Sequence, residues 1–246
     1  KDTPLQTIKK VGVIGAGTMG GGISMNFANV GIPVKILEMD QAALDKGLGI
    51  VKKNYEASAW KGRISSEDVD VRMGLIEGTI NYSDLKDVDL VIEAVFENMD
   101  VKKEVFSKLN ETVSENTILA SNTSYLDIDE IATVVDNPER VLGMHFFSPA
   151  NIMRLLEIIK AEKTSPAILA TVLKLAKSIK KVGAVAGVCH GFIGNRMLTG
   201  YSREANLLVL EGAPPEQVDR VLYEFGMPMG VIAMADMAGI DIGTRL

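Results

Sequence analysis

The sequence predicts an α/β fold, in which helices cover a mostly parallel sheet and a smaller all-α domain follows. Up to residue 188, short apolar runs alternate with segments of helical periodicity, which is typical of a parallel sheet with covering helices. After Gly191 only helical patterns remain. We therefore expect one domain over residues 1–188 and a helical domain over residues 189–246.

A glycine-rich turn follows the first predicted strand, Val11–Ile14. Its pattern, Gly15-x-Gly17-x-x-Gly20, lies between a β-branched strand and a helical stretch. In such a turn, Gly15 permits the tight bend, Gly17 lets the backbone approach a pyrophosphate, and Gly20 lets the helix pack on the strand. The free N–H groups and the dipole at the start of the helix then bind the phosphates. The pattern predicts a Rossmann-type dinucleotide site, and the alternative is a purely structural glycine turn.

An acidic residue follows the second predicted strand, Val34–Leu37. Glu38 lies about 20 residues after the last glycine, where an acid binds the ribose hydroxyls of NAD. The same carboxylate would repel the 2′-phosphate of NADP. The sequence therefore predicts NAD as the cofactor.

The later elements follow from apolar periodicity. A long helical excursion, over residues 41–61 and 65–74, precedes a strand over residues 89–95 that is buried on both faces. Asp100 is expected to cap the next helix. The other predicted strands cover 117–121, 140–146, 155–159 and 182–188, and the other predicted helices cover 101–113, 128–135, 166–180, 193–211 and 215–225.

Composition excludes several classes of function. The formal net charge of −6, without a Lys/Arg cluster, argues against a nucleic-acid partner. No apolar run reaches the roughly 18 residues of a membrane span, and the first residues lack the apolar core of a signal peptide. A single cysteine, Cys189, excludes an internal disulfide and fits a reducing compartment. With two histidines and one cysteine, we expect no metal site.

A dinucleotide site implies hydride transfer, and oxidation of an alcohol also needs a base. Only His145 and His190 are available as histidine bases. His145 lies at the C-terminal end of a predicted strand, in GMHFFSP, at the edge where ligands bind to open α/β sheets. The alternative is a core histidine with a structural role.

Glu157 lies inside an apolar strand, LLEII, where an unpaired carboxylate is costly. Its candidate partners are His145, Arg154 and Lys160. A carboxylate on one imidazole nitrogen would fix the tautomer and stabilise the imidazolium. We expect the pair with His145, and the alternative is an edge-strand glutamate that faces water.

Three further features permit both a functional and a structural interpretation. Cys189 and His190 are adjacent in an extended segment and point to opposite faces, which argues against a Cys–His dyad. The polar run 121–124 ends a strand at the same sheet edge, where it either binds substrate or cofactor or forms the turn into the next helix. Asn195, in GFIGNR, either reaches back over the cleft or lies at a helix terminus.

Six motifs in order resemble the L-3-hydroxyacyl-CoA dehydrogenases of fatty-acid β-oxidation. They are VGVIGAGTMGGGI, IEAVFENMDVK, ASNTS, GMHFFSPANIMRLLEII, GFIGNRM and PEQVDRVLYEFGMPMG. The resemblance runs from Lys9 to the end of the chain. Ser148 stands where single-function relatives usually have Asn, so the closest resemblance is to the dehydrogenase portion of multifunctional β-oxidation proteins.

The resemblance implies NAD-dependent oxidation of an L-3-hydroxyacyl-CoA to the 3-ketoacyl-CoA. It implies that His145 is the general base, oriented by Glu157, and that Ser124 and Asn195 contact the reacting oxygen. It also implies that the helical excursion holds the CoA moiety. The implied cofactor contacts are Gly15, Ala16, Gly17, Met19, Gly20, Glu38, Glu97, Lys102 and Asn122.

The resemblance also has implications for the partners of this protein and for alternative functions. Relatives continue past GIDIGTRL, so we expect an incomplete helical domain, with a homodimer contact or an enoyl-CoA hydratase domain on the same polypeptide. The β-hydroxyacid dehydrogenases share the glycine turn but use a lysine, which GFIGNRM lacks. A non-catalytic NAD-binding or structural protein is the rival of another class, and the intact His145 and Glu157 argue against it.

Overall fold

The structure is a computed structural model that describes residues 3–238. The segment GIDIGTRL, on which the expectation of an incomplete helical domain rests, lies outside the described residues. The chain forms two compact units, Lys1–Phe192 and Ile193–Leu246. Among the described residues, none of the helices combines the length and apolar character needed to span a bilayer.

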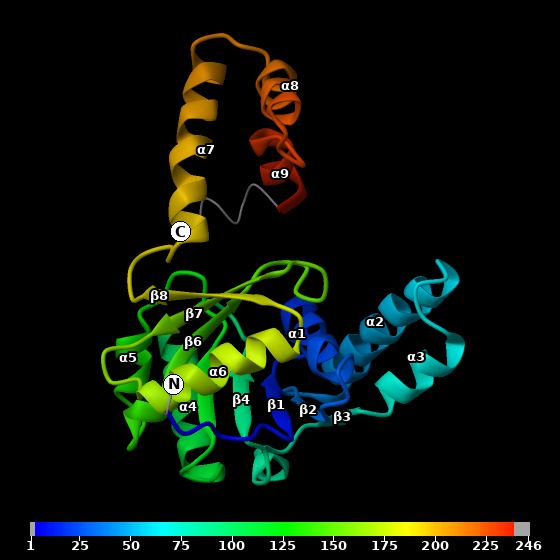
Figure 1. Ribbon diagram of the computed structural model, residues 1–246, viewed down its shortest axis with the longest axis vertical. Coiled ribbons are helices and arrows are strands. Elements are labelled where there is room, and N and C mark those ends of the chain that lie inside the picture. Colours follow the sequence, from blue (N-terminus) through cyan, green and yellow to red (C-terminus); the bar gives the residue numbers. More distant parts are fainter. Residues whose placement is uncertain (1–2, 239–246) are drawn as a thin grey trace. The chain divides into compact units, whose positions relative to one another are not determined.

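The first unit is built on one eight-stranded sheet (Figure 1). Its strands are β1 (Val11–Ile14), β2 (Val34–Leu37), β3 (Ile76–Thr79), β4 (Leu90–Glu93), β5 (Ile118–Ser121), β6 (Val141–Phe146), β7 (Leu155–Lys160) and β8 (Val182–Gly187). Their order is β3-β2-β1-β4-β5-β6-β7-β8. Only the β6–β7 pair is antiparallel, which confirms a mostly parallel, Rossmann-like sheet.

Helices cover both faces of the sheet and bury a separate core layer on each. The helices of this unit are α1 (Thr18–Ala28), α2 (Gln41–Trp60), α3 (Ser66–Met73), α4 (Met99–Thr112), α5 (Ile128–Ala132) and α6 (Pro166–Ser178), with short 3-10 helices η1 (Tyr82–Leu85) and η2 (Pro138–Arg140). Apolar residues of α1, α2, α3 and α6 pack on one face, and those of α4 and α5 pack on the other.

Strand alternation assigns the polar residues of the sheet to the α4–α5 face. Met144 and Phe146 of β6 belong to the α1–α6 layer, so His145 between them points to the opposite face. Glu157 of β7 and Glu93 of β4 also lie on the α4–α5 face, because their strand neighbours lie in the α1–α6 layer. Three buried polar groups therefore share one face of the sheet.

Two sequence predictions need correction. No strand was expected between residues 74 and 89, but β3 pairs there with β2 at the sheet edge. Asp100 was expected to cap the helix over 101–113, but Asn98 is the N-cap of α4, and its side chain accepts a hydrogen bond from Val101 N. Asp100 lies in the first turn instead. Most other predicted elements differ from the structure only at their ends.

Tyr55 joins the helical excursion to α1. Its ring is fully buried, and its hydroxyl donates to Asn29 Oδ1 at 3.1 Å. Burial raises the pKa of Tyr55 from its usual 10.0 to about 12. The phenol therefore stays protonated in the folded chain over a pH range in which the unfolded chain ionises.

Tyr55→Phe is expected to reduce the loss of folding stability that occurs as the pH rises above 10. Above pH 10 the unfolded state releases the Tyr55 proton while the folded state keeps it until about pH 12, so this group lowers stability as pH rises through that window. Melting temperatures of both proteins between pH 8 and about 11 would measure the difference. Parallel curves for the two proteins would contradict the linkage.

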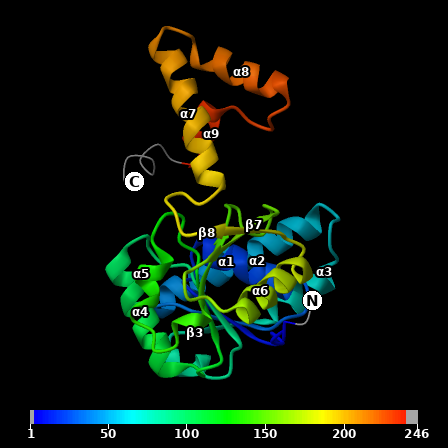
Figure 2. The same ribbon diagram turned by 60° about the vertical axis from the view of Figure 1, so that its left-hand side comes forward.

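The second unit is helical. It contains α7 (Gly194–Leu210), α8 (Pro215–Phe225) and α9 (Val231–Ala238), which Figure 2 shows from a second direction. Its small core consists of Ala205, Val218 and Val231, one residue from each helix. Gly226 ends α8 in a left-handed conformation, with φ of 111°.

Candidate functional site

The glycine turn between β1 and α1 has the geometry that the motif predicts. Gly15 has a φ of +97°, which disfavours any side chain. A Cβ on Gly20 would lie 1.8 Å from the carbonyl oxygen of Gly15, so the close approach of helix and strand requires glycine there. At Gly17, in contrast, a Cβ would meet no protein atom within 4 Å. Packing within the protein therefore explains two of these glycines, and the third faces open space.

The groups around this turn suit the phosphates and ribose of a dinucleotide. No side chain caps the N-terminus of α1, so its first N–H groups remain available to an anion. The carboxylate of Glu38, at the end of β2, accepts hydrogen bonds from Ala16 N and Met39 N, both at 2.8 Å. Each carboxylate oxygen has further acceptor capacity, which ribose hydroxyls can use. Of the other turn residues, Ala16 is buried and Met19 packs partly buried against the core.

Replacing Gly17 or Gly20 with Ala is expected to have different consequences. Gly17 has a φ of −68°, which Ala adopts freely, so Gly17→Ala should keep the melting temperature. Its methyl group would occupy the open side of the turn, and we expect the Kd for NADH to rise at least about tenfold, or about 1.4 kcal/mol. Gly20→Ala should instead destabilise the fold, because its Cβ would overlap Gly15 O. Fluorescence titration and thermal unfolding separate the two effects, and tight NADH binding by Gly17→Ala would count against a pyrophosphate at this position.

His145 and Glu157 form a buried pair. They are directly opposite each other on β6 and β7, and Nδ1 of His145 lies 2.8 Å from Oε2 of Glu157. The two side chains are 4% and 0% exposed. Of the three partners considered for Glu157, the structure pairs it with His145. Because a carboxylate accepts hydrogen bonds, this contact places the neutral imidazole proton on Nδ1 and leaves the Nε2 lone pair for another group.

Aromatic rings surround this pair. The His145 ring lies 4.5 Å from the ring of Phe147 and 5.8 Å from that of Phe192, between centroids. Phe192 is buried with a positive φ of 46°, which is rare for a bulky residue. Two aromatic rings therefore flank the imidazole, in addition to the carboxylate.

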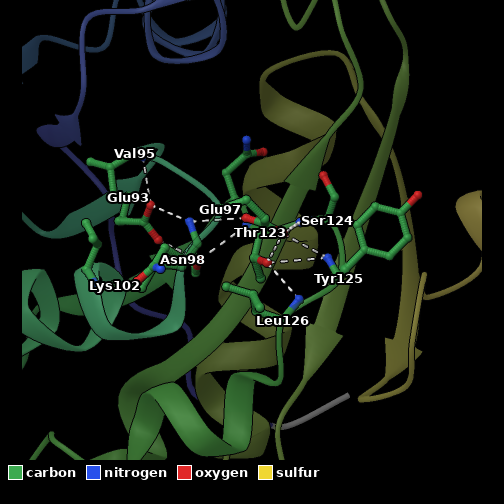
Figure 3. A network of polar contacts seen from close by, with 12 residues as sticks. Glu93, Val95, Glu97, Asn98, Lys102, Thr123, Ser124, Tyr125 and Leu126 are labelled. Carbon is green, nitrogen blue, oxygen red and sulfur yellow. Dashed lines mark hydrogen bonds and ion pairs between the residues drawn. The ribbon is translucent and has the colours of Figure 1, made fainter. Parts of the chain in front are cut away.

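A turn at the end of β5 carries Ser124, and Glu97 fixes this turn. One carboxylate oxygen of Glu97, Oε1, accepts hydrogen bonds from Thr123 Oγ1, from Ser124 N at 2.8 Å and from Tyr125 N at 3.1 Å (Figure 3). Asn122 uses its side-chain oxygen to accept from Phe146 N at 2.8 Å, beside His145. The run 121–124 therefore forms an ordered turn whose donors are largely occupied by protein groups.

Lys102 of α4 is 1% exposed and lies in an ion pair with Glu93, at 2.7 Å. Its ammonium is also 3.5 Å from Oε2 of Glu97. Glu93 was not predicted as a site residue from the sequence, although it meets the same criterion as Glu157. Both are carboxylates inside apolar strands, here in DLVIEAV.

Of the other residues considered from the sequence, Cys189 and His190 follow β8, and Asn195 lies in the second unit. Cys189 Sγ contacts the carbonyl oxygen of Phe192, and the His190 ring packs on Tyr125 with centroids 5.0 Å apart. Cys189 and His190 therefore contact different residues and not each other. Asn195 belongs to the second unit, in the first turn of α7, and is half-buried there. Within residues 3–238, no group of three or more His, Cys, Asp or Glu side chains is placed to hold a metal ion.

The helical excursion forms a groove between α2 and α3, with a volume of about 450 Å3. Its polar lining residues are Lys52, Ser66 and the two carboxylates of Glu56 and Asp70. Lys52 lies 3.9 Å from Glu56, and the ring of Trp60 at the groove is 87% exposed.

Comparison with known proteins identifies both parts of the chain. Residues 10–189 match the family described as 3-hydroxyacyl-CoA dehydrogenase, NAD binding domain, and residues 191–246 match the C-terminal domain of the same family. These matches confirm the family resemblance of the sequence motifs and the prediction of NAD.

Individual relatives agree with this match. The chain is 44% identical over its full length to the peroxisomal bifunctional enzyme of Homo sapiens, and 41% identical over 96% of its length to a peroxisomal fatty acid beta-oxidation multifunctional protein of Arabidopsis thaliana. It spans 34% and 32% of those two proteins, about a third of each. The crystal structure of (S)-3-hydroxybutyryl-CoA dehydrogenase from Ralstonia eutropha superposes with a TM-score of 0.92 at 37% identity, covering 96% of this chain and 84% of that one.

Proposed function

This chain belongs to the 3-hydroxyacyl-CoA dehydrogenase family, and we propose that it oxidises an L-3-hydroxyacyl-CoA to the 3-ketoacyl-CoA with NAD. The observation that carries this proposal is the buried 2.8 Å contact of His145 with Glu157 in a chain with an NAD-binding fold. A histidine oriented by a carboxylate is suited to remove the proton of a hydroxyl group.

His145 is the general base in this proposal. Its Nδ1 is held by Glu157, so Nε2 is the nitrogen that accepts the hydroxyl proton. Glu157 then stabilises the imidazolium that forms, because both side chains are buried from water and the attraction between opposite charges is weakly screened there. When bound, NAD supplies the acceptor for the hydride that leaves C3.

Ser124 and Asn195 position the reacting oxygen in this proposal. The backbone of Ser124 is fixed by Glu97, and among the described residues its hydroxyl has no hydrogen-bond partner in the structure. A free hydroxyl on a rigid turn can donate to a carbonyl oxygen without a rearrangement of the chain. The role of Asn195 rests on the family motif GFIGNRM.

The cofactor is held by the glycine turn and Glu38 in this proposal. The open side of Gly17 and the uncapped start of α1 suit the pyrophosphate, and Glu38 suits the ribose hydroxyls. Glu97, Lys102 and Asn122 would serve the nicotinamide half. Of these, Lys102 is almost fully buried, so its effect on the cofactor side passes through Glu97.

The CoA moiety is assigned to the groove between α2 and α3. Lys52 can exchange its contact with Glu56, at 3.9 Å, for one with a phosphate, and the exposed ring of Trp60 can stack on a base. We further propose that this unit acts beside an enoyl-CoA hydratase unit of a longer polypeptide, since relatives named bifunctional or multifunctional are about three times as long.

The loss of NADH absorbance with acetoacetyl-CoA tests the proposed reaction. We expect turnover with NADH and much weaker turnover with NADPH, because of Glu38. Turnover with free 3-hydroxy acids but not with thioesters would favour a β-hydroxyacid dehydrogenase. Binding of NADH without turnover of any thioester would indicate a non-catalytic NAD-binding protein. Assays across acyl chain lengths would then define the substrate.

A further inference from the structure

We infer that Glu93 is a positioning residue, which keeps Lys102 paired so that Glu97 remains bound to the turn that carries Ser124. Its effect on catalysis rests on the proposed function, whereas its effect on the turn does not. Glu93 itself lies below the surface and contacts neither substrate nor cofactor in this proposal.

Glu93 has a complete set of partners at the end of β4. Its carboxylate accepts hydrogen bonds from Val95 N at 2.8 Å, from Lys102 Nζ at 2.7 Å and from Ser121 Oγ at 2.6 Å. The side chain is 0% exposed. A buried carboxylate is stable only with such partners. Through these contacts Glu93 connects the ends of β4 and β5 with the first turn of α4.

Lys102 lies between two carboxylates, and the distances show how it is shared. Its ammonium is 2.7 Å from Glu93 but 3.5 Å from Glu97. Because Lys102 is 1% exposed, its ammonium has little contact with water that could compensate for a lost partner. If Glu93 lost its charge, Glu97 would be the nearest remaining carboxylate, and the buried cation would attract it.

Glu97 has a competing task in the turn after β5. Its Oε1 accepts from Thr123 Oγ1, Ser124 N and Tyr125 N, and Figure 3 shows these contacts beside the Glu93–Lys102 pair. A movement of Glu97 toward Lys102 would lengthen these hydrogen bonds. Glu97 thus contacts the turn through Oε1 and the cation, more weakly, through Oε2, and Glu93 determines the balance between these two contacts.

Two single variants separate this role from a purely structural one. Both break the Glu93–Lys102 ion pair, but only one of them leaves the buried cation in place. In Glu93→Gln the cation remains, so Glu97 should move toward it and the amides of Ser124 and Tyr125 should exchange faster with solvent. In Lys102→Met no cation remains, so Glu97 should stay on the turn and these amides should stay protected. Amide hydrogen exchange measured by NMR on both variants, with the Val101 amide that Asn98 caps as an internal reference, gives this comparison.

A matched control and a milder variant complete the experiment. Lys103, the next residue of α4, pairs with Glu130 at the same distance of 2.7 Å on the surface, so Glu130→Gln should leave turn protection and kcat unchanged. If Glu93→Gln does not fold, Glu93→Asp can replace it, because it keeps the charge on a shorter side chain. The amides of Ser124 and Tyr125 in Glu93→Asp should exchange faster than in the wild-type protein but more slowly than expected for Glu93→Gln. With acetoacetyl-CoA, Glu93→Gln should lose roughly 10- to 100-fold in kcat, as expected for a displaced substrate contact, with a smaller change in the KM for NADH.

The outcomes are distinguishable from a failure of the proposed function. If the wild-type protein does not turn over acetoacetyl-CoA, the proposed reaction is wrong, but the amide exchange still decides the role of Glu93. Equal exchange in the Glu93 and Lys102 variants, or wild-type exchange in both, would overturn the inference.

Discussion

Replacing His145 with Gln is expected to lower kcat by about 10²–10⁴-fold, the usual contribution of a general acid or base. Gln is similar in reach and hydrogen bonding, but it cannot take up a proton. NADH should bind as in the wild-type protein, because the glycine turn and Glu38 belong to other strands of the sheet. Stopped-flow or steady-state loss of NADH absorbance measures kcat, and a fluorescence titration measures binding.

His190→Gln is the matched control for that experiment. His190 is the other histidine of the chain, and it is exposed. The kcat of His190→Gln should stay within about twofold of the wild-type value, in line with the small effect of most surface substitutions. Near-normal turnover by the His145 variant would exclude it as the base.

Replacing Glu157 with Gln is expected to have the second-largest effect, a loss in kcat of about 10²-fold or more by analogy with carboxylates that orient a catalytic histidine. The amide is neutral, so it cannot stabilise the imidazolium, and its NH2 group can favour the wrong tautomer. The change is nearly isosteric at a fully buried position, so the fold should persist. The pH–rate profile should change together with kcat.

Lys160→Gln provides the control on the same strand. Lys160 ends β7 and is exposed, so its replacement changes the charge of β7 away from the buried pair. We expect its kcat and pH–rate profile to match those of the wild-type protein. An unchanged pH–rate profile in the Glu157 variant would argue that the pair has a structural role alone.

Much of the fold follows from local patterns in the sequence. The first strand, the glycine turn and the second strand have strong signals, and their predicted bounds match β1 and β2. β3 was missed because it is a four-residue edge strand with Glu77 and Gly78 at its centre, a combination without apolar alternation. Its position depends on packing, since α2 lies so close that a Cβ on Gly78 would be 3.0 Å from Leu44.

The candidate site was predictable only in part. The pairing of His145 with Glu157 follows from the cost of a carboxylate in an apolar strand. That β7 runs antiparallel to β6 does not follow from either strand alone, because direction is set by tertiary packing. The contacts of Glu93, Lys102 and Glu97 with the turn after β5 join segments that are separate in sequence, so no local pattern contains them.

The direct opposition of His145 and Glu157 also has a consequence for folding. A one-residue slip of β7 against β6 would send every side chain of β7 to the opposite face of the sheet. Glu157 would then be buried in the apolar layer beneath α1 and α6, without its imidazole partner. Such a mispaired sheet would carry an unpaired buried charge, which is strongly unfavourable. The contact proposed to carry the chemistry therefore also selects the native alignment of the only antiparallel strand pair in the described sheet.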